Sequence, residues 1–345
     1  MSNRGIPESI MKYVGKKLNK NMIAPGGSLL LKAEEVLTER HAIVFSRLNV
    51  DVRDGDVDDP APARRMVDEA MAEVSELFRS AANAETVYFD QIRRRVLPTI
   101  RKLTETCTLY HVLSALQEKD DYTHKHSIAV AVLSSLIGKW LRFGKDELEL
   151  LSGAALLHDV GKAQLPAELL TKTGKLSPEE FELIKKHTVL GYEFIRNVPG
   201  FSETHAIAAL QHHERMDGSG YPHGLTGETH RFSRIVAVAD VFHAMLSHRP
   251  YKRAQPFYIV VKEMSNGAFG QFDPLIVDLF TRKAMEALIG NEVLLSDGRR
   301  ARIVRVNAND PANPLVMRGE RFIDLARSPD LNIVEASPSA RVVTS

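Results

Sequence analysis

The sequence predicts a mainly α-helical protein with a small mixed unit at its N-terminus and a small β appendage near its C-terminus. From Ala63 onward, apolar residues recur at three- and four-residue steps, which is the period of helices that bury one face. Residues 111–286 show no strong alternation of the kind that marks half-buried strands. After Gly290, two strand-like runs meet at Asp297-Gly298, a strong hairpin signal, and FIDLA and LNIVEA could add short strands.

Length and composition indicate a globular protein of two or three domains. The chain has 345 residues, of which 44% are hydrophobic and 26% are charged, and its formal net charge is +1 at pH 7. Such a charge gives no whole-molecule field that would attract nucleic acid, so local charge must recruit any anionic substrate. Cys107 is the only cysteine, which excludes an internal disulfide and fits a reducing compartment.

No stretch of the sequence has the character of a leader or a membrane span. The N-terminal MSNRGIPESIMKYVGKK lacks an apolar core of signal-peptide length. The longest apolar stretch, Ile128 to Gly138, is too short to span a bilayer, and we expect it to form a buried helix. These features predict a cytoplasmic protein without membrane insertion.

Changes in pattern divide the chain into four parts. Residues 1–58 form a small mixed unit of unknown role, and the acidic stretch 51–62 has the composition of a linker. Residues 59–110 are a linker and helical segment, 111–286 form the helical domain, and 287–345 form the β appendage and a tail.

Two apolar stripes precede the helical domain. They consist of Ala63, Met66, Val67, Ala70, Val74, Leu77, Phe78 and Ala81, and then of Phe89, Ile92, Val96, Ile100, Leu103, Cys107, Tyr110 and Ser114. Pro98 interrupts the second stripe and should kink or start a helix. Such stripes are typical of a core, but their spacing also approximates a heptad, so a dimerisation helix and a homodimer are the alternative.

Histidine and aspartate residues recur where apolar helices meet polar positions. His126 opens an apolar helix, His158 and Asp159 end an apolar run, and Asp240 ends the apolar run IVAVAD. The full set is His126, His158, Asp159, His187, His212, His213 and Asp240. So many buried polar groups would be costly without a shared purpose, and several helices can aim them at one centre. Any single histidine could instead be structural, and we assign that role to His41, His111, His124, His205, His223, His230 and His248.

The types of side chain in this set indicate a metal centre. Histidine and carboxylate without thiolate suit Fe, Mn, Zn, Co or Ni. Two metal ions could share Asp159 as a bridge and hold a hydroxide between them, which would be a nucleophile at neutral pH. Lys162 lies on the same face as Asp159 if the helix continues, and it could stabilise charge on a phosphoryl oxygen.

The stretch HHERMDGSGYPHGLTGE, residues 212–228, adds features suited to substrate recognition. Gly218 and Gly220 allow the backbone to approach a ligand closely or to adopt a positive φ. Tyr221 offers a ring and a hydroxyl to a nucleobase or a phosphate, and Pro222 stiffens the exit of the loop. Without its position after the double histidine, this loop would be an ordinary turn.

A basic cluster, HRPYKR, follows eight residues after Asp240. Arg249 and Lys252 lie three residues apart and could clamp phosphate oxygens. The alternative is a solvated basic turn.

These motifs together resemble the HD-GYP family, a branch of the HD phosphohydrolases. The resemblance covers about residues 111–286, and the stretches that match stand in the family's order: DDYTHKHS, LLHDVGK, TGKLSPEEFELIKKHTVLGYEFI, HHERMDGSGYPHGLTGE, RIVAVADVF, RPYK and GQFDP. It implies an HD-type helical bundle and the hydrolysis of cyclic di-GMP to linear pGpG and/or GMP, which lowers a second messenger in bacterial signalling.

The resemblance also implies roles for individual residues. Two divalent metal ions, Fe or Mn or another transition metal, would be bound by His126, His158, Asp159, His187, His212, His213 and Asp240. Lys162 would contact the scissile phosphate or the bridging water. Substrate would be bordered or bound by Asp217, Gly218, Gly220, Tyr221, Pro222, Arg249 and Lys252.

The sequence departs from the family pattern at several positions. Tyr122 replaces a Glu that binds a third metal ion in some members, which favours a binuclear site. His243 stands where the family has Asp, on the same helix face as Asp240, and could support a ligand, act as an extra ligand or signal altered activity. Thr173 and Thr229-His230 also differ, and we expect them to alter loops and not chemistry.

Two other functions remain open from the sequence. The first is a catalytically weak cyclic di-GMP receptor, which His243 leaves open although the complete ligand set argues against it. The second is a phosphohydrolase that acts on another nucleotide or cyclic dinucleotide, against which the intact DGSGYP loop argues.

Overall fold

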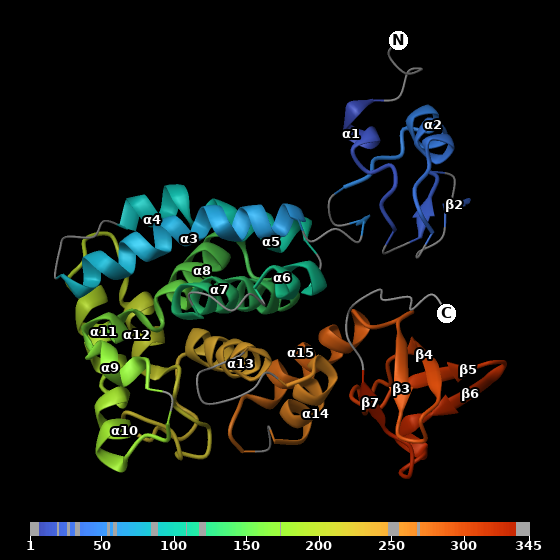
Figure 1. The fold of residues 1–345 in the computed structure, drawn as a ribbon. Helices are drawn as coiled ribbons and strands as arrows, with labels where there is room; N and C mark the ends of the chain where they lie inside the picture. The colour runs from blue at the N-terminus through green and yellow to red at the C-terminus, as the bar shows by residue number, and fades with distance from the viewer. Residues whose placement is uncertain are drawn as a thin grey trace.

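The computed structural model confirms a mainly α-helical chain with a strand pair near the N-terminus and a sheet near the C-terminus (Figure 1). The structure describes residues 7–18, 21–25, 28–31, 35–53, 56–57, 61–83, 89–107, 109–116, 122–172, 174–247, 255–267 and 270–335. The described residues form two separate hydrophobic cores. One belongs to the N-terminal unit, and the other is shared by the central helices and the C-terminal sheet.

The N-terminal unit is mixed, as predicted. Its elements are α1 (Glu8–Met11), β1 (Met22–Ile23), β2 (Leu29–Leu31) and α2 (Glu39–Arg47), and β1 pairs antiparallel with β2. The acidic stretch expected to be a linker contributes to this unit, because Val52 and Val57 are buried in its core and Val57 bridges to Leu18. Val52 and Val57 therefore pack into the core, and Asp56 between them is buried too, where its Oδ2 atom accepts a hydrogen bond from the Arg53 backbone.

Four helices lie between this unit and the central domain: α3 (Ala61–Ala82), α4 (Phe89–Arg95), α5 (Leu97–Thr106) and α6 (Leu109–Leu116). All eight residues of the first apolar stripe are buried inside this chain, which confirms that the stripe of α3 belongs to a core. A homodimer stays a prediction. Pro98 occupies the first turn of α5, so it starts a helix. The N–H groups of a first turn have no hydrogen-bond partner within the helix, so the missing N–H of proline costs nothing there.

Among the described residues of the central domain, all regular elements are helices or 3₁₀ turns, joined by loops such as residues 212–230. It contains α7 (Tyr122–Trp140), α8 (Lys145–Leu157), the 3₁₀ turn η2 (Val160–Gln164), α9 (Ala167–Leu170), α10 (Pro178–Lys185), α11 (His187–Arg196), α12 (Glu203–Gln211), α13 (Arg231–Leu246), α14 (Phe257–Gly267) and α15 (Pro274–Glu286). Every residue from Ile128 to Gly138 in α7 is buried, as predicted, because α8 and α13 pack against this helix. No described helix is long and apolar enough to cross a bilayer.

The C-terminal sheet is antiparallel with strand order β6-β5-β4-β3-β7. Its elements are β3 (Glu292–Leu295), β4 (Arg300–Arg305), β5 (Leu315–Arg318), β6 (Arg321–Asp324), the 3₁₀ turn η3 (Leu325–Arg327) and β7 (Ile333–Glu335). The hairpin predicted at Asp297-Gly298 joins β3 to β4, and Gly298 has a φ of +77°. Strand β5 was not predicted, because it has only four residues and follows a stretch rich in Asn, Asp and Pro.

Candidate metal centre

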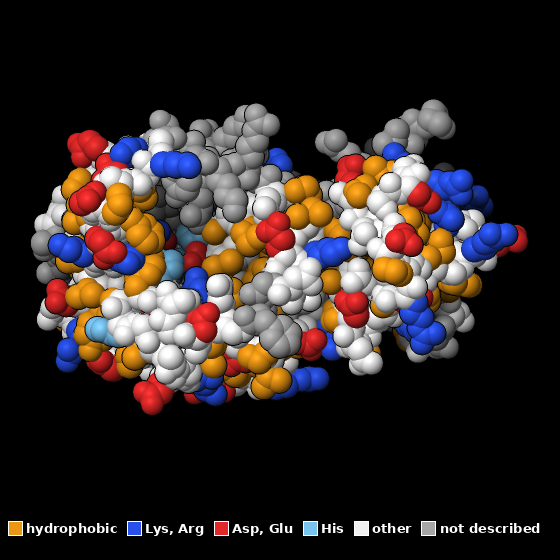
Figure 2. Space-filling model, turned by 90° about the horizontal axis from the view of Figure 1, so that it is seen from below, with side chains coloured by type: hydrophobic (Ala, Val, Ile, Leu, Met, Phe, Trp, Pro, Cys, Tyr) orange, Lys and Arg blue, Asp and Glu red, His pale blue; other side chains and the backbone are white. Residues whose placement is uncertain are grey.

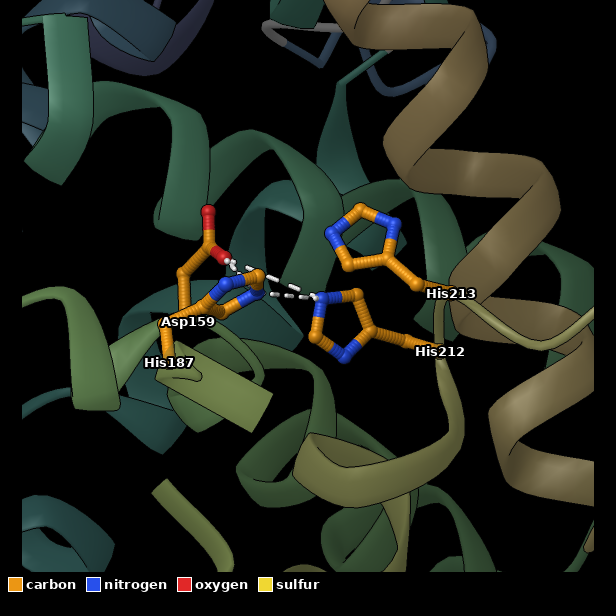
Figure 3. A group of neighbouring side chains, drawn as sticks. All are labelled: Asp159, His187, His212 and His213. Atoms are coloured by element: carbon orange, nitrogen blue, oxygen red, sulfur yellow. Dashed lines mark hydrogen bonds and ion pairs between the residues drawn. The ribbon is translucent and has the colours of Figure 1, made fainter. Parts of the chain in front are cut away.

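The seven side chains proposed as metal ligands come from different helices and meet at one buried place. His126 lies in α7, His158 and Asp159 follow the end of α8, His187 begins α11, His212 and His213 follow α12, and Asp240 lies in α13. One position differs from expectation, since His126 is in the second turn of its helix and does not open it, while Asp240 lies in the middle of α13. Figure 3 shows four of these side chains pointing toward one another.

Asp159 stands between two pairs of histidines. Its Oδ1 atom is 3.3 Å from His187 Nε2 and 3.7 Å from His212 Nε2. Its Oδ2 atom is 3.3 Å from His158 Nε2 and 3.7 Å from His126 Nε2. Two sets of side chains could therefore each hold a metal ion, and Asp159 is the member they share.

Asp240 lies beside both sets. Its Oδ1 atom is 3.0 Å from His126 Nε2, and its Oδ2 atom is 4.0 Å from His213 Nδ1. Asp240 is thus the second carboxylate of the centre, on the side that faces α13.

Backbone carbonyl groups orient three of the histidines. In each case Nδ1 can donate to the carbonyl three residues earlier: 2.7 Å from His158 to Ala155, 2.7 Å from His187 to Ile184 and 2.8 Å from His212 to Ala209. A proton on Nδ1 leaves the lone pair of Nε2 directed at the centre, which is the tautomer a metal ligand needs. His126 differs from these three, since its Nδ1 atom lies 2.9 Å from Nδ1 of buried His243.

Burial keeps most of these imidazoles neutral. It lowers the pKa of His126 to about 4 and that of His187 to about 3, because water no longer solvates the charged form. Burial alone would lower the pKa of His158 too, but the negative charge of Asp159 raises it. Burial would raise the pKa of Asp159, but the charge of Lys162 holds that pKa well below its usual value. An ionised carboxylate among imidazoles is suited to a metal cation, whose binding would displace any imidazole proton.

The donor atoms of the centre fit a divalent transition metal. His158 Nε2 and Asp159 Oδ1 are buried and have no hydrogen-bond partner among the described residues. Such atoms are costly in a protein interior unless a cation or a donor satisfies them. Imidazole and carboxylate together, without thiolate, suit the metals from Mn to Zn.

Lys162 lies beside the centre, as predicted, although α8 does not continue to it. The chain leaves α8 after Leu157 and enters η2, whose tighter turn still brings Lys162 Nζ to 2.6 Å from Asp159 Oδ2. The Lys162 side chain keeps 24% of its surface exposed, whereas Asp159 keeps 1%. Lys162 therefore connects the buried carboxylate with the solvent-facing side of the centre.

The loop from Asp217 to Pro222 borders the centre on one side. The Tyr221 ring stacks on the ring of His213, with centroids 4.6 Å apart. Gly218 has a φ of +78°, as predicted, and Asp217 Oδ1 accepts hydrogen bonds from Ser219. Figure 2 shows histidine side chains at the bottom of a hollow in the molecule's surface.

Gly220 packs closely against the protein's own chain. A Cβ at this position would collide with the backbone of His213 and Arg215. The glycine therefore lets the loop pack onto the chain that carries the two adjacent histidines, and the close approach is to the protein's own backbone.

Three residues that shape the site escaped the sequence analysis. Buried Glu214 accepts hydrogen bonds from the backbone of His223 at 2.7 Å and Leu225 at 2.9 Å. Arg234 donates to the carbonyls of Gly227 and Thr229 and so ties the loop to α13. Gly161 packs so tightly on the start of α11 that a Cβ would collide with the His187 carbonyl. In the sequence, the only signals for Glu214 and Gly161 are their positions in the HHE and HDVG stretches. The residues that they contact are distant in sequence.

Some predicted positions can be placed only in part. Arg249, Lys252 and Thr173 lie outside the described residues, as does the side chain of Tyr122. Five histidines assigned structural roles lie outside both sets of candidate metal ligands: His41, His124, His205, His223 and His230. His248 and the side chain of His111 lie outside the described residues.

Known proteins resemble the chain over this helical region. Residues 110–276 match a protein family described as HD domain. The cyclic di-GMP phosphodiesterase response regulator RpfG of Xanthomonas campestris is 36% identical over 55% of this chain and 52% of its own length. A cyclic di-GMP phosphodiesterase of Pseudomonas aeruginosa is 30% identical over 74% of this chain and 65% of its own. A 3′3′-cGAMP-specific phosphodiesterase of Vibrio cholerae is 36% identical over 45% of this chain and 34% of its own.

The chain spans between one third and two thirds of the length of these relatives. Among solved structures, a "HDG"Y"P" protein from Bdellovibrio bacteriovorus superposes with a TM-score of 0.54 at 19% identity, over 78% of this chain and 96% of its own. That similarity concerns the fold.

Proposed function

This chain belongs to the HD-GYP family of HD domains, and from that premise we propose that it is a phosphodiesterase that hydrolyses cyclic di-GMP to pGpG and/or GMP. The observation that carries the proposal is the buried centre in which each oxygen of Asp159 faces its own pair of histidines. The names of two relatives support this choice of substrate and a role in bacterial signalling.

We assign the metal ligands to two sets that share Asp159. One set adds His187, His212 and His213, and the other adds His126, His158 and Asp240. Two divalent ions, Fe or Mn or another transition metal, suit these donors. When bound, the ions would polarise the phosphodiester and lower the pKa of water, so that water can attack at neutral pH.

Hydrolysis replaces the bond between phosphorus and a 3′ oxygen with a bond to a water oxygen, and the departing 3′ oxygen gains a proton. Negative charge grows on the non-bridging oxygens as this happens. Lys162 is placed to stabilise that charge, because its ammonium group lies at the centre's edge and its side chain is partly exposed. The same ammonium group keeps Asp159 ionised and thus able to bind metal ions.

The loop of Asp217, Gly218, Gly220, Tyr221 and Pro222 is proposed to border the substrate. Tyr221 supports this role, because its ring lies against His213 at the edge of the centre. Arg249 and Lys252, outside the described residues, remain the predicted phosphate contacts.

His243 is proposed to hold His126 in its ligand orientation. If Nδ1 of His126 carries a proton and donates to His243 Nδ1, then Nε2 of His126 is left to bind a metal ion. Ser247 Oγ, 3.2 Å from His243 Nε2, can accept the proton on the far side of that ring.

The test is anaerobic purification with metal quantification, followed by a hydrolysis assay with cyclic di-GMP on the same sample. We expect about two metal ions per chain and product formation, and Asp159→Ala should lose both because Asp159 belongs to both sets. Asp330→Ala, an exposed aspartate in the C-terminal region, is the control. Normal hydrolysis by Asp159→Ala would contradict the assignment. Metal-loaded protein that binds the ligand without turnover would instead indicate a receptor.

A further inference from the structure

Three side chains of α10 lie next to the proposed substrate loop and are not part of the metal centre: Phe181, Glu182 and Lys185. Phe181 is a large apolar residue, yet 45% of its surface is exposed. Its ring centroid is 6.3 Å from that of Tyr221, and the two rings meet edge to face. Since Tyr221 stacks on His213, a row of rings runs from the metal centre to an exposed aromatic surface.

Lys185 brings a positive charge to the same place. Its Nζ atom is 5.1 Å from the Phe181 centroid and 5.5 Å from the Tyr221 centroid. The same atom donates a 2.6 Å hydrogen bond to Glu182 Oε1. An aromatic ring, a carboxylate and an ammonium group are therefore gathered within one turn of the helix, beside the mouth of the site.

The position of α10 is fixed from both ends. At its start, Ser177 and Glu180 form a reciprocal capping box, and Lys172 holds the Glu180 carboxylate at 2.6 Å. Past its end comes His187, two residues after Lys185, which faces Asp159. The three side chains are thus held at a set spacing from the metal centre.

These groups match the chemistry of guanine. Its Watson–Crick edge presents N–H donors that a carboxylate accepts, whereas O6 and N7 accept hydrogen bonds from a lysine, and any base can stack on an exposed ring. Adenine presents an acceptor at N1 and a donor at N6, so its edge has the opposite pattern. A carboxylate beside a lysine therefore favours guanine over adenine.

We propose that Phe181, Glu182 and Lys185 form a guanine-binding subsite for one base of the substrate. Phe181 provides the stacking surface, and Glu182 and Lys185 read the edge of the base. The inference rests on the proposed function, because it takes the substrate to be a purine cyclic dinucleotide whose phosphate reaches the metal centre. It adds a source of base specificity that the metal centre itself does not provide.

The chain offers matched controls for each change. Lys283 and Glu286 on α15 form an ion pair with the same three-residue spacing and the same 2.6 Å distance as Lys185 and Glu182. Phe322 on β6 is another exposed phenylalanine, with 66% of its surface accessible. The pairs of variants are Phe181→Ala with Phe322→Ala, Glu182→Gln with Glu286→Gln, and Lys185→Met with Lys283→Met.

The experiment measures kcat/KM of each metal-loaded variant for cyclic di-GMP, 3′3′-cGAMP and cyclic di-AMP. Loss of a base stack or a base-edge contact typically costs about 1–3 kcal/mol, or about 5-fold or more in affinity. We therefore expect Phe181→Ala to lower kcat/KM about 5-fold or more for all three substrates, and Phe181→Tyr to retain it. Glu182→Gln and Lys185→Met should lower the preference for cyclic di-GMP over cyclic di-AMP by about 5-fold or more, with metal content unchanged.

Specificity ratios equal to those of the α15 controls would overturn the subsite. If the wild-type protein forms no product from any of these substrates, the proposed hydrolysis fails separately. Calorimetric titration of the same variants with cyclic di-GMP and cyclic di-AMP then decides on the subsite. It stands if Glu182→Gln weakens binding of the guanine ligand alone, and it falls if both ligands bind as they do to wild type.

Discussion

Replacement of Lys162 by Met separates two roles that we propose for this side chain. Lys162 Nζ donates to Asp159 Oδ2 at 2.6 Å, so it stabilises a buried carboxylate. It also lies at the partly exposed edge of the centre, where it could meet a phosphate oxygen. Methionine keeps most of the length of the side chain and removes only its charge and its donors.

The size of each effect follows from the surroundings. Removing one partner of a fully buried ion pair costs about 3–5 kcal/mol. Because 24% of the Lys162 side chain is exposed, solvent screens part of the interaction, and we expect a loss of about 2 kcal/mol in the metal-free protein. That loss corresponds to a fall in Tm of roughly 4–8 °C. The loss of one group that stabilises transition-state charge lowers kcat by about 10²–10³-fold.

The assays are thermal unfolding of the metal-free protein, metal content after loading, and kcat with cyclic di-GMP. Lys283→Met, which breaks an exposed ion pair with the same spacing, should change Tm by no more than about 2 °C. We expect Lys162→Met to retain its metal ions, because no ligand atom has been removed and a bound cation would itself keep Asp159 ionised. A kcat within about threefold of wild type would refute the catalytic role. Loss of the metal ions together with activity would mean that Lys162 acts only through Asp159.

Two further changes test the surroundings of the centre. Glu214→Gln turns a carboxylate that accepts hydrogen bonds from two backbone N–H groups into an amide. It should lower the free energy of unfolding by about 1–3 kcal/mol, measured by denaturant titration, and raise KM, measured by steady-state kinetics. Unaltered KM would mean that the loop does not bind substrate. Burial lowers the pKa of His205 to about 4, so this imidazole binds a proton more readily in the unfolded chain than in the folded protein. The free energy of unfolding should therefore fall by about 3 kcal/mol as the pH drops from 6.5 to 4. His205→Gln should flatten that part of the profile, and an unchanged slope would exclude His205 as its source.

Local patterns in the sequence were enough to predict most of the fold. The stripe of α3 repeats with the helical period, so its buried face could be identified residue by residue. The hairpin at Asp297-Gly298 follows from turn chemistry alone. The four-residue strand β5 lacks such a signal, because its existence depends on the neighbours β4 and β6 that pair with it. Val52 and Val57 were likewise hidden in an acidic stretch, since their burial depends on contacts with the N-terminal unit.

The sequence predicted which residues gather at the candidate site better than it predicted the geometry there. Residue types and motif order pointed to all seven proposed ligands, and the structure brings them together. The role of Gly220 could not be inferred in the same way, because the atoms that exclude a Cβ belong to the backbone of His213 and Arg215. The buried Glu214 also looked like any other charged residue of a loop, since its partners lie nine and eleven residues away.

The ends of two helices explain how adjacent residues can serve one centre. Neighbouring side chains within an α-helix diverge by about 100°, so two consecutive ligands cannot both face the same point while the helix continues. His158 and Asp159 follow the last residue of α8, and His212 and His213 follow the last residue of α12. The backbone at Asp159 has left the helical region, with φ −103° and ψ 6°. His126 and Asp240, which are proposed as single ligands, need no such break and lie within α7 and α13. The two consecutive pairs in the sequence therefore mark the ends of two helices as well as the proposed metal centre.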